Sequence, residues 1–287
     1  PSPNSRPYIC TEGPDGNLWF CESGSSKIGM LNLDTHKFTE YSLPTDNAMP
    51  IGIIYGSDND LWFCEKAANK IGRITLGGHI SEFDLPTPNS GPDGIMLGPD
   101  GNIWFSMTET SRIGRITSSG TITQFGNGIP SGARPLSIVV RNNSLWFSLA
   151  AADYIGCLNA NGEINLYPIP TKNSQPRAMT VHQDGSIWFV QTNSNSLGRI
   201  DDTGKMTEYK VTTPEASLRG VVTTADGEIW ATENFANKIA HMSASGKMIG
   251  EYDIPTHQSG ARCITSTSKG RIFFTQYDAG SIGEVLR

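Results

Sequence analysis

The sequence predicts an all-β protein, a seven-bladed β-propeller built from four-stranded antiparallel blades. The first observation is a repeat, in which an aromatic residue returns every 42 or 43 residues, at Trp19, Trp62, Trp104, Trp146, Trp188, Trp230 and Phe273. A period of roughly 40 to 50 residues is typical of propellers and other repeat proteins. The second is that each unit contains four short runs rich in β-branched and aromatic residues, without helix-favouring stretches. We therefore expect one propeller domain over residues 1–287 rather than an open solenoid, because a closed ring leaves only short strand edges.

The second unit shows the four expected strands clearly, over residues 51–56, 60–65, 70–75 and 80–86. A turn sequence separates the first run from the second in each unit, such as GPDG at 13–16 and RNNS at 141–144. These residues favour tight hairpins. The seventh unit ends after its third run, and the proline-rich residues 1–7 suit a central strand poorly. We therefore expect a last blade of three strands, or one whose fourth strand lies outside this sequence.

Composition and charge narrow the classes of partner. The chain is 37% hydrophobic, its net charge is −6, and no apolar run reaches the roughly 18 residues that span a membrane. No basic stripe is present, so we expect neither nucleic acid nor an anionic membrane as a partner. The sequence does not indicate an oligomeric state. The sequon at Asn142 and the absence of an initiator Met slightly favour the secretory pathway or the extracellular space.

Five cysteines occur without a CxxC spacing, which argues against structural zinc and thioredoxin-like chemistry. We expect them to be buried as small hydrophobic residues. Cys10 and Cys263 belong to the first and last units, which a closed ring makes neighbours, so a disulfide between them is compatible with the fold.

The candidate site follows from strand direction. The start of each first strand and the end of each second strand lie on the same face of the ring, called the top face here. The residue that opens each first strand is expected to line the mouth of the central channel: Tyr8, Ile51, Asp93, Leu136, Arg177, Arg219 and Arg262. The hairpin is scaffold and must repeat, whereas a residue that meets ligand is free to differ. The ends of the second strands are expected to add a second ring of Glu22, Glu65, Met107, Leu149, Gln191, Glu233 and Gln276.

Purely structural interpretations compete with this one. Arginines and glutamates near the mouth can hold adjacent blades together, since buried charges need partners. The three glutamates can also pair with Lys27, Lys70 and Lys238 in their own loops, and the repeated tryptophans are expected to form the core between blades. Of the histidines, only His257 falls in a top-face loop. The chain has no Ser-His-Asp arrangement, Walker motif or dinucleotide fingerprint, so we expect no cofactor and no metal site.

The pattern P-x-G-I-x-x-x-x-D-G-x-I-W-F-x-E, followed by N-K-I-G-R-I, resembles the streptogramin B lyase (virginiamycin B lyase) family over nearly the whole chain. EKAANKIGRI at 65–74 and ENFANKIA at 233–240 are close matches. The resemblance implies a propeller that opens a depsipeptide ring by elimination, with histidines in the last two blades, nearby glutamates and magnesium. By position, the tyrosine of the first blade matches Tyr8, but Arg219 and Arg262 stand in place of the histidines and Gly260 in place of a glutamate. Arginine cannot act as a general base at neutral pH.

These observations favour a cofactor-independent lyase or cyclase of natural-product metabolism that acts on an acidic, largely apolar small molecule. Arg177, Arg219 and Arg262 would hold and polarise an anionic oxygen, Tyr8 and Asp93 would move protons, and the apolar mouth residues would form walls. The chain also resembles fungal propellers that join a tropolone quinone methide to a terpene by a hetero-Diels–Alder reaction. One alternative is a streptogramin B lyase that uses magnesium and another base such as His257. A binding propeller without chemistry is the other.

Overall fold

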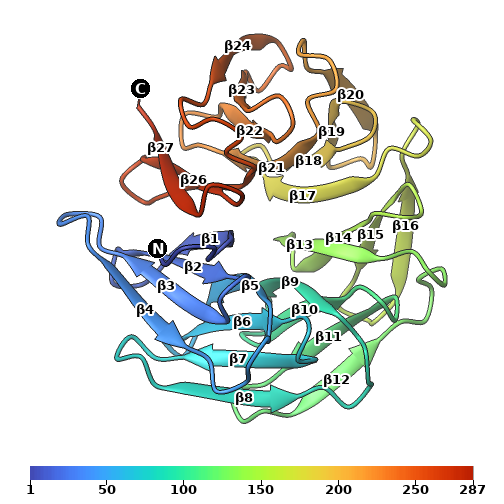
Figure 1. Ribbon diagram of the computed structural model, residues 1–287. Coiled ribbons are helices and arrows are strands. Elements are labelled where there is room, and N and C mark those ends of the chain that lie inside the picture. The colour runs from blue at the N-terminus through green and yellow to red at the C-terminus, as the bar shows by residue number, and fades with distance from the viewer. Residues whose placement is uncertain (287) are drawn as a thin grey trace.

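Seven antiparallel sheets surround one central axis in the computed structural model, which describes residues 1–286 (Figure 1). Six of these sheets have four strands and the last has three, and no helix occurs in the described part of the chain. This confirms the predicted all-β propeller and its three-stranded last blade. None of the described residues forms a helix of the length and apolarity needed to cross a bilayer.

The strands follow the chain from the axis outward in every blade. Blades one to three contain β1 (Pro7–Glu12), β2 (Leu18–Glu22), β3 (Lys27–Leu31), β4 (Phe38–Ser42); β5 (Pro50–Tyr55), β6 (Leu61–Glu65), β7 (Lys70–Ile74), β8 (Ile80–Asp84); β9 (Pro92–Leu97), β10 (Ile103–Met107), β11 (Arg112–Ile116) and β12 (Ile122–Phe125). Blades four and five contain β13 (Pro135–Arg141), β14 (Ser144–Leu149), β15 (Tyr154–Leu158), β16 (Ile164–Pro168); β17 (Pro176–Val181), β18 (Ile187–Gln191), β19 (Ser196–Ile200) and β20 (Met206–Lys210). Blades six and seven contain β21 (Leu218–Thr223), β22 (Ile229–Glu233), β23 (Lys238–Met242), β24 (Met248–Asp253); β25 (Ala261–Ser266), β26 (Ile272–Gln276) and β27 (Ser281–Val285).

The apolar core lies between neighbouring blades, as the aromatic repeat predicts. Trp19 is fully buried, stacks on Tyr41 of its own blade with ring centroids 5.6 Å apart, and packs with Ile53 and Phe63 of the second blade. Burial of a side chain this large is worth several kcal/mol in total. Each of the seven apolar clusters between blades contains one of the repeated tryptophans or Phe273.

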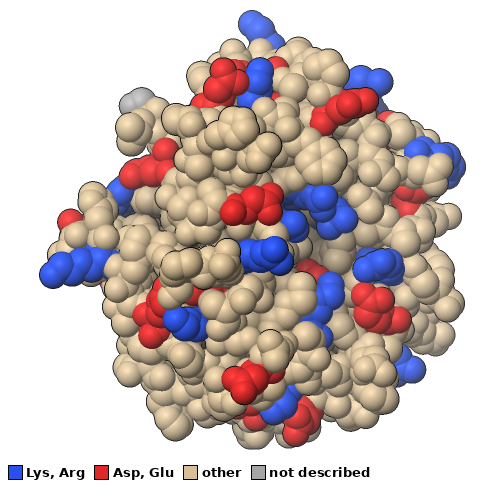
Figure 2. All heavy atoms as spheres, viewed as in Figure 1, with Lys and Arg blue, Asp and Glu red and all other residues tan. Residues whose placement is uncertain are grey.

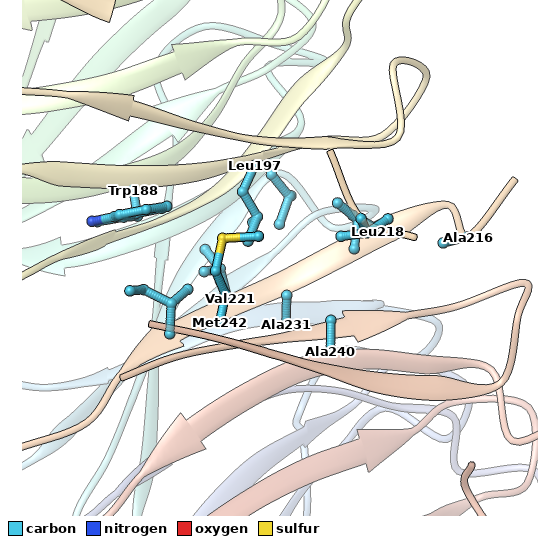
Figure 3. Close-up of a cluster of buried hydrophobic side chains, with 11 residues drawn as sticks. Trp188, Leu197, Ala216, Leu218, Val221, Ala231, Ala240 and Met242 are labelled. Carbon is cyan, nitrogen blue, oxygen red and sulfur yellow. The ribbon is translucent and has the colours of Figure 1, made fainter. Parts of the chain in front are cut away.

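Figure 3 shows one of these layers, between blades five and six. Trp188 and Leu197 come from the fifth blade, and Leu218, Val221 and Met242 come from the sixth. All five are at least nine-tenths buried. Adjacent blades therefore cannot shift against each other without opening an apolar interface.

The hairpin turns also fix the tryptophans. The indole Nε1 of Trp19 donates to Oδ1 of Asp15 in the preceding GPDG turn at 3.1 Å, and Trp104 donates in the same way to Asp100 at 2.9 Å. This pairing satisfies the polar edge of a ring that is otherwise buried in hydrocarbon. The turn aspartate and the tryptophan are paired in this way in each of the first three blades.

The ring closes between the last and first blades. β25 lies against β1, and the Thr275 hydroxyl donates to the carbonyl of Tyr8 at 2.8 Å. The sulfur atoms of Cys10 and Cys263 are 3.7 Å apart and both thiols are free, so the expected proximity is confirmed without a bond between them. Residues 1–6 form no strand, and Ser2 contacts Glu40 of the first blade instead.

Candidate functional site

A β-bulge at the start of each first strand aims the residues of the channel mouth. In the first blade, Pro7 pairs with Glu22 and Cys10 with Phe20, so that Tyr8 and Ile9 together oppose one residue of β2. The same irregularity recurs in all seven blades. Bulges of this kind turn a side chain away from its regular alternation. The residue before each first strand has a positive φ in every blade, at Arg6, Met49, Gly91, Arg134, Gln175, Ser217 and Gly260.

Buried hydroxyl groups hold several of these bulges in place. The Thr232 hydroxyl accepts the backbone N–H of Gly220 and donates to the carbonyl of Arg262 in the next blade, both at 2.8 Å. Ser106 does the same for Gly94 and the carbonyl of Leu136, at 2.9 and 2.7 Å. These bonds satisfy backbone groups that a regular ladder would otherwise pair. The backbone that carries the mouth side chains is therefore fixed from behind, independently of what those side chains are.

The first strands enclose one cavity of about 300 Å³ along the ring axis. Six of the seven predicted mouth residues line it: Tyr8, Asp93, Leu136, Arg177, Arg219 and Arg262. Ile51 is the exception, since its side chain is packed away from solvent and is only 1% exposed. The volume lies at the lower end of the range for small-molecule sites. In Figure 2, Lys and Arg atoms gather around the hollow at the centre of the viewed face.

The three arginines carry the strongest electrostatic signal in the cavity. All three are half-buried, and each has an Nε atom that is buried without a hydrogen-bond partner. Neither Arg177 nor Arg219 forms an ion pair with a carboxylate of residues 1–286. Burial, followed by the charges of Arg177 and Arg262, lowers the pKa of Arg219 to about 10. Three guanidinium groups that line one cavity without an ion-pair partner among residues 1–286 have the chemistry to bind an anion.

Aromatic rings support one arginine of the cluster. The guanidinium of Arg262 lies 3.8 Å from the ring centroid of Tyr277 and 5.0 Å from that of Tyr8. Its Nη1 donates to the Tyr8 hydroxyl at 3.4 Å. Stacking on ring faces orients a guanidinium without neutralising it. Tyr277 was not predicted from the sequence, although it directly follows Gln276 at the end of β26.

Among residues 1–286, Asp93 is the one carboxylate that lines the cavity, and it is already paired with a lysine. Lys66 donates from Nζ to its Oδ2 at 2.6 Å. Lys66 follows the end of β6, and Thr108, at the corresponding place after β10, donates to the carbonyl of Pro135 in the next blade at 2.9 Å. In blades two, three, five and six the residue after the second strand bonds to the next blade, and Tyr277 of blade seven lies against Tyr8 of blade one. Polar or aromatic residues at this shared position could therefore have identified Lys66 and Tyr277.

The predicted second ring does not surround the cavity. Its seven members are buried at the ends of the second strands, at most 6% exposed, and outside the cavity lining: Glu22, Glu65, Met107, Leu149, Gln191, Glu233 and Gln276. The second strand is one strand removed from the axis, so its side chains meet the blades rather than the channel. Met107 and Leu149 belong to the apolar layers between blades. His257 is exposed on the loop before β25 and does not line the cavity.

The buried glutamates instead face acidic residues of their own blades. The Glu65 side chain lies over Gly72 of β7, because a Cβ atom added at Gly72 would be 2.8 Å from Oε1 of Glu65. Gly72 in turn pairs with Glu82 of the next strand, β8. Burial, and then the negative charge of Glu82, raises the pKa of Glu65 to about 8. Burial likewise raises the pKa values of Glu22 and Glu233 to about 7. These carboxyl groups are therefore internal features of the blades.

The donor set of the cavity does not suit magnesium. Mg²⁺ prefers several oxygen ligands, usually including carboxylates. The cavity offers one carboxylate, that of Asp93, which is paired with Lys66 and shares the site with three guanidiniums. No group of three or more metal-ligating side chains occurs within residues 1–286.

Comparisons with known proteins agree with the fold and its sequence pattern. The family described as the virginiamycin B lyase family matches residues 1–285. This chain belongs to the virginiamycin B lyase family. A solved structure of streptogramin B lyase has 34% identity and a TM-score of 0.93, with 99% of this chain and 94% of that chain covered. A search of curated proteins finds no match.

Two further structures come from Staphylococcus aureus. Virginiamycin B lyase with selenomethionine has 36% identity and a TM-score of 0.93, covering 99% of this chain and 95% of that chain. A catalytically inactive variant of that lyase, solved with quinupristin, has 36% identity and a TM-score of 0.93, covering 98% of this chain and 94% of that chain. Arg219 and Arg262, which the sequence resemblance matches to the histidine positions of the family, both line the cavity.

Proposed function

We propose that this member of the virginiamycin B lyase family is a non-hydrolytic lyase or cyclase that acts on an anionic, largely apolar small molecule in the central cavity. One observation supports the proposal above all others: Arg177, Arg219 and Arg262 meet in one half-buried site without a carboxylate partner from residues 1–286. Guanidinium groups bind enolate, phenolate or carboxylate oxygens with charge-assisted hydrogen bonds.

In this proposal, the arginines stabilise negative charge that develops on a substrate oxygen. A preorganised donor of this type contributes roughly 10²–10³-fold in rate in other enzymes. The Tyr8 hydroxyl lies next to Arg262 and faces the cavity, so it is the group placed to donate or accept a proton there. Asp93 would act through its bond with Lys66, either as a proton acceptor or by repelling anions from that side.

A cyclisation suits these residues because it needs no leaving group and no water. In a hetero-Diels–Alder reaction, a quinone methide and an alkene form one C–C and one C–O bond, and all atoms stay in the product. The arginines would polarise the oxygen of the quinone methide, and the apolar wall around Leu136 would hold the alkene. An elimination would use the same arginines and would require Tyr8 or Asp93 to take the proton.

Replacement of Arg219 or Arg262 with alanine tests the assignment. We expect turnover of a tropolone quinone-methide precursor and a terpene, followed by mass spectrometry, to fall at least about tenfold. The melting temperature should not fall, because each change removes a like charge from a cluster. Arg112→Ala, at the exposed start of β11, is the matched control. Equal turnover in the cavity variants would refute the role of the arginines.

Family membership supports a second candidate, a streptogramin B lyase. Incubation with quinupristin and magnesium, followed by mass spectrometry, tests it, and a ring-opened linear product would favour this candidate over the first. The arginines at the two histidine positions count against it, since a guanidinium stays protonated at neutral pH. A binding propeller without chemistry would bind the anionic ligand and release it unchanged in both assays.

A further inference from the structure

The balance of charge in the central cavity goes beyond the need for an anion. We infer that the ligand carries at least two negative charges on one head group, as a phosphate monoester, a diphosphate or a compact dicarboxylate does. This inference rests on the proposed anion site and specifies its ligand further, since a substrate with a single negative charge, such as a tropolonate, does not satisfy it.

The count of charges on the cavity wall supports a dianion. Arg177, Arg219 and Arg262 contribute three positive charges, and Asp93 is the carboxylate that lines the same wall. Lys66 neutralises Asp93 through a contact of 2.6 Å. A ligand with one negative charge would leave two guanidiniums uncompensated in a partly buried site, which is costly.

The hydrogen-bonding capacity of the cluster leads to the same conclusion. The Nε atoms of Arg177, Arg219 and Arg262 are buried and have no acceptor among residues 1–286. Arg262 has two aromatic rings and one hydroxyl around its guanidinium, and none of these groups is charged. Three planar donor groups need more acceptor oxygens than one carboxylate provides, whereas a phosphate group offers three or more.

Repulsion within the cluster adds a physical reason. Arg219 lies on the blade between those of Arg177 and Arg262, and both of them disfavour its charged form after burial has done so. A doubly charged ligand would relieve this repulsion at all three groups at once. The gain in affinity from the second charge should therefore exceed that of an exposed ion pair.

The arrangement of the wall also orients the ligand. The arginines occupy β17, β21 and β25, whereas Asp93 lies on β9 across the ring. The first strands also line the cavity with the apolar side chains of Ile54, Met96 and Val222 and with the threonines Thr11, Thr180 and Thr265. The head group would therefore sit against blades five to seven, with a short apolar part directed along the axis.

The test compares two ligands of similar shape and different charge. Phenyl phosphate is a dianion at pH 8, because its second pKa is about 6, and benzenesulfonate is a monoanion. Calorimetry at pH 8 and constant ionic strength should give a dissociation constant for phenyl phosphate that is at least about tenfold lower. Phthalate supplies the dicarboxylate arm. Binding of phthalate at a similar affinity supports the shared dianion chemistry, and its weak binding narrows the head group to phosphate.

Variants locate the effect. Arg219→Gln should abolish most of the preference for phenyl phosphate. Arg112→Gln, at the exposed start of β11, changes the net charge by the same amount and should preserve the preference. Equal affinity of the wild-type protein for phenyl phosphate and benzenesulfonate would overturn the inference while leaving the proposed anion site intact. Failure of every one of these anions to bind would overturn both.

Discussion

The buried glutamate of the second blade makes the stability of the propeller sensitive to alkaline pH. The pKa of Glu65 is about 8 in the folded protein, against an ordinary value of 4.5. Between about pH 4.5 and pH 8, Glu65 is therefore protonated in the folded protein but ionised in the unfolded chain. The free energy of unfolding falls as the pH rises through that window. The stabilising contribution is complete below about pH 4.5 and is lost once the pH passes about 8.

The magnitude follows from the shift. Between pH 6 and pH 9 a group with these two pKa values lowers the free energy of unfolding by about 2–3 kcal/mol. Glu65→Gln removes this dependence of stability on pH, because glutamine has nearly the same shape as a protonated glutamate and does not titrate. Gln191 already occupies the corresponding position at the end of β18 in blade five, where Gly198 of β19 likewise pairs with a glutamate, Glu208.

Urea unfolding followed by tryptophan fluorescence measures the effect. From pH 6 to pH 9, the free energy of unfolding of the wild type should fall by about 2–3 kcal/mol more than that of Glu65→Gln. The reverse change, Gln191→Glu, should introduce a new loss at alkaline pH. Glu215→Gln, at an exposed position, is the control. If the wild type and Glu65→Gln lose stability in parallel between the two pH values, the assignment of a buried, protonated Glu65 is wrong.

Two further predictions concern the closure of the ring. Thr275→Val should lower the free energy of unfolding by about 1–3 kcal/mol, because the carbonyl of Tyr8 and the N–H of Cys263 lose their partner; an unchanged urea midpoint would contradict this. Val190 occupies the same position in blade five, which shows that the volume is tolerated. Treatment with diamide should join Cys10 and Cys263 and raise the unfolding free energy by about 2–4 kcal/mol. Cys263→Ser should prevent this loss of two hydrogen masses. Because the chain has five cysteines, the oxidised wild type should retain three free thiols, and a count of five would refute the prediction.

The sequence predicts the architecture because the signals are local and repeated. The spacing from Trp19 to Phe273 sets the number of blades, and the early end of the last unit predicts its three strands. The mouth positions of six blades are also confirmed as lining residues, since the innermost strand is the first one in each unit. Their roles in chemistry stay predictions.

The second ring could not be placed correctly because sequence position gives the end of a strand but not the face that its side chain meets. Glu65 and Glu233 lie near the top face along the chain, yet Glu233 pairs with Leu218, the buried neighbour of Arg219, and Glu65 pairs with Pro50, and paired residues share one side of a sheet. The glutamates therefore point into their blades. The contact between Lys66 and Asp93 crosses from one blade to the next, so a single unit does not reveal it and only a comparison of the same position in several units does.

The repeated bulge separates what the ring needs from what a ligand needs. Backbone pairing, a residue with positive φ before the strand and, in several blades, a hydroxyl behind it fix the main chain at the mouth, so its path does not depend on which side chain the mouth position carries. Arginine, leucine, aspartate and tyrosine can thus occupy equivalent sites in one molecule. A single substitution at one mouth position can therefore change the lining of the cavity in one blade without altering the backbone that supports it.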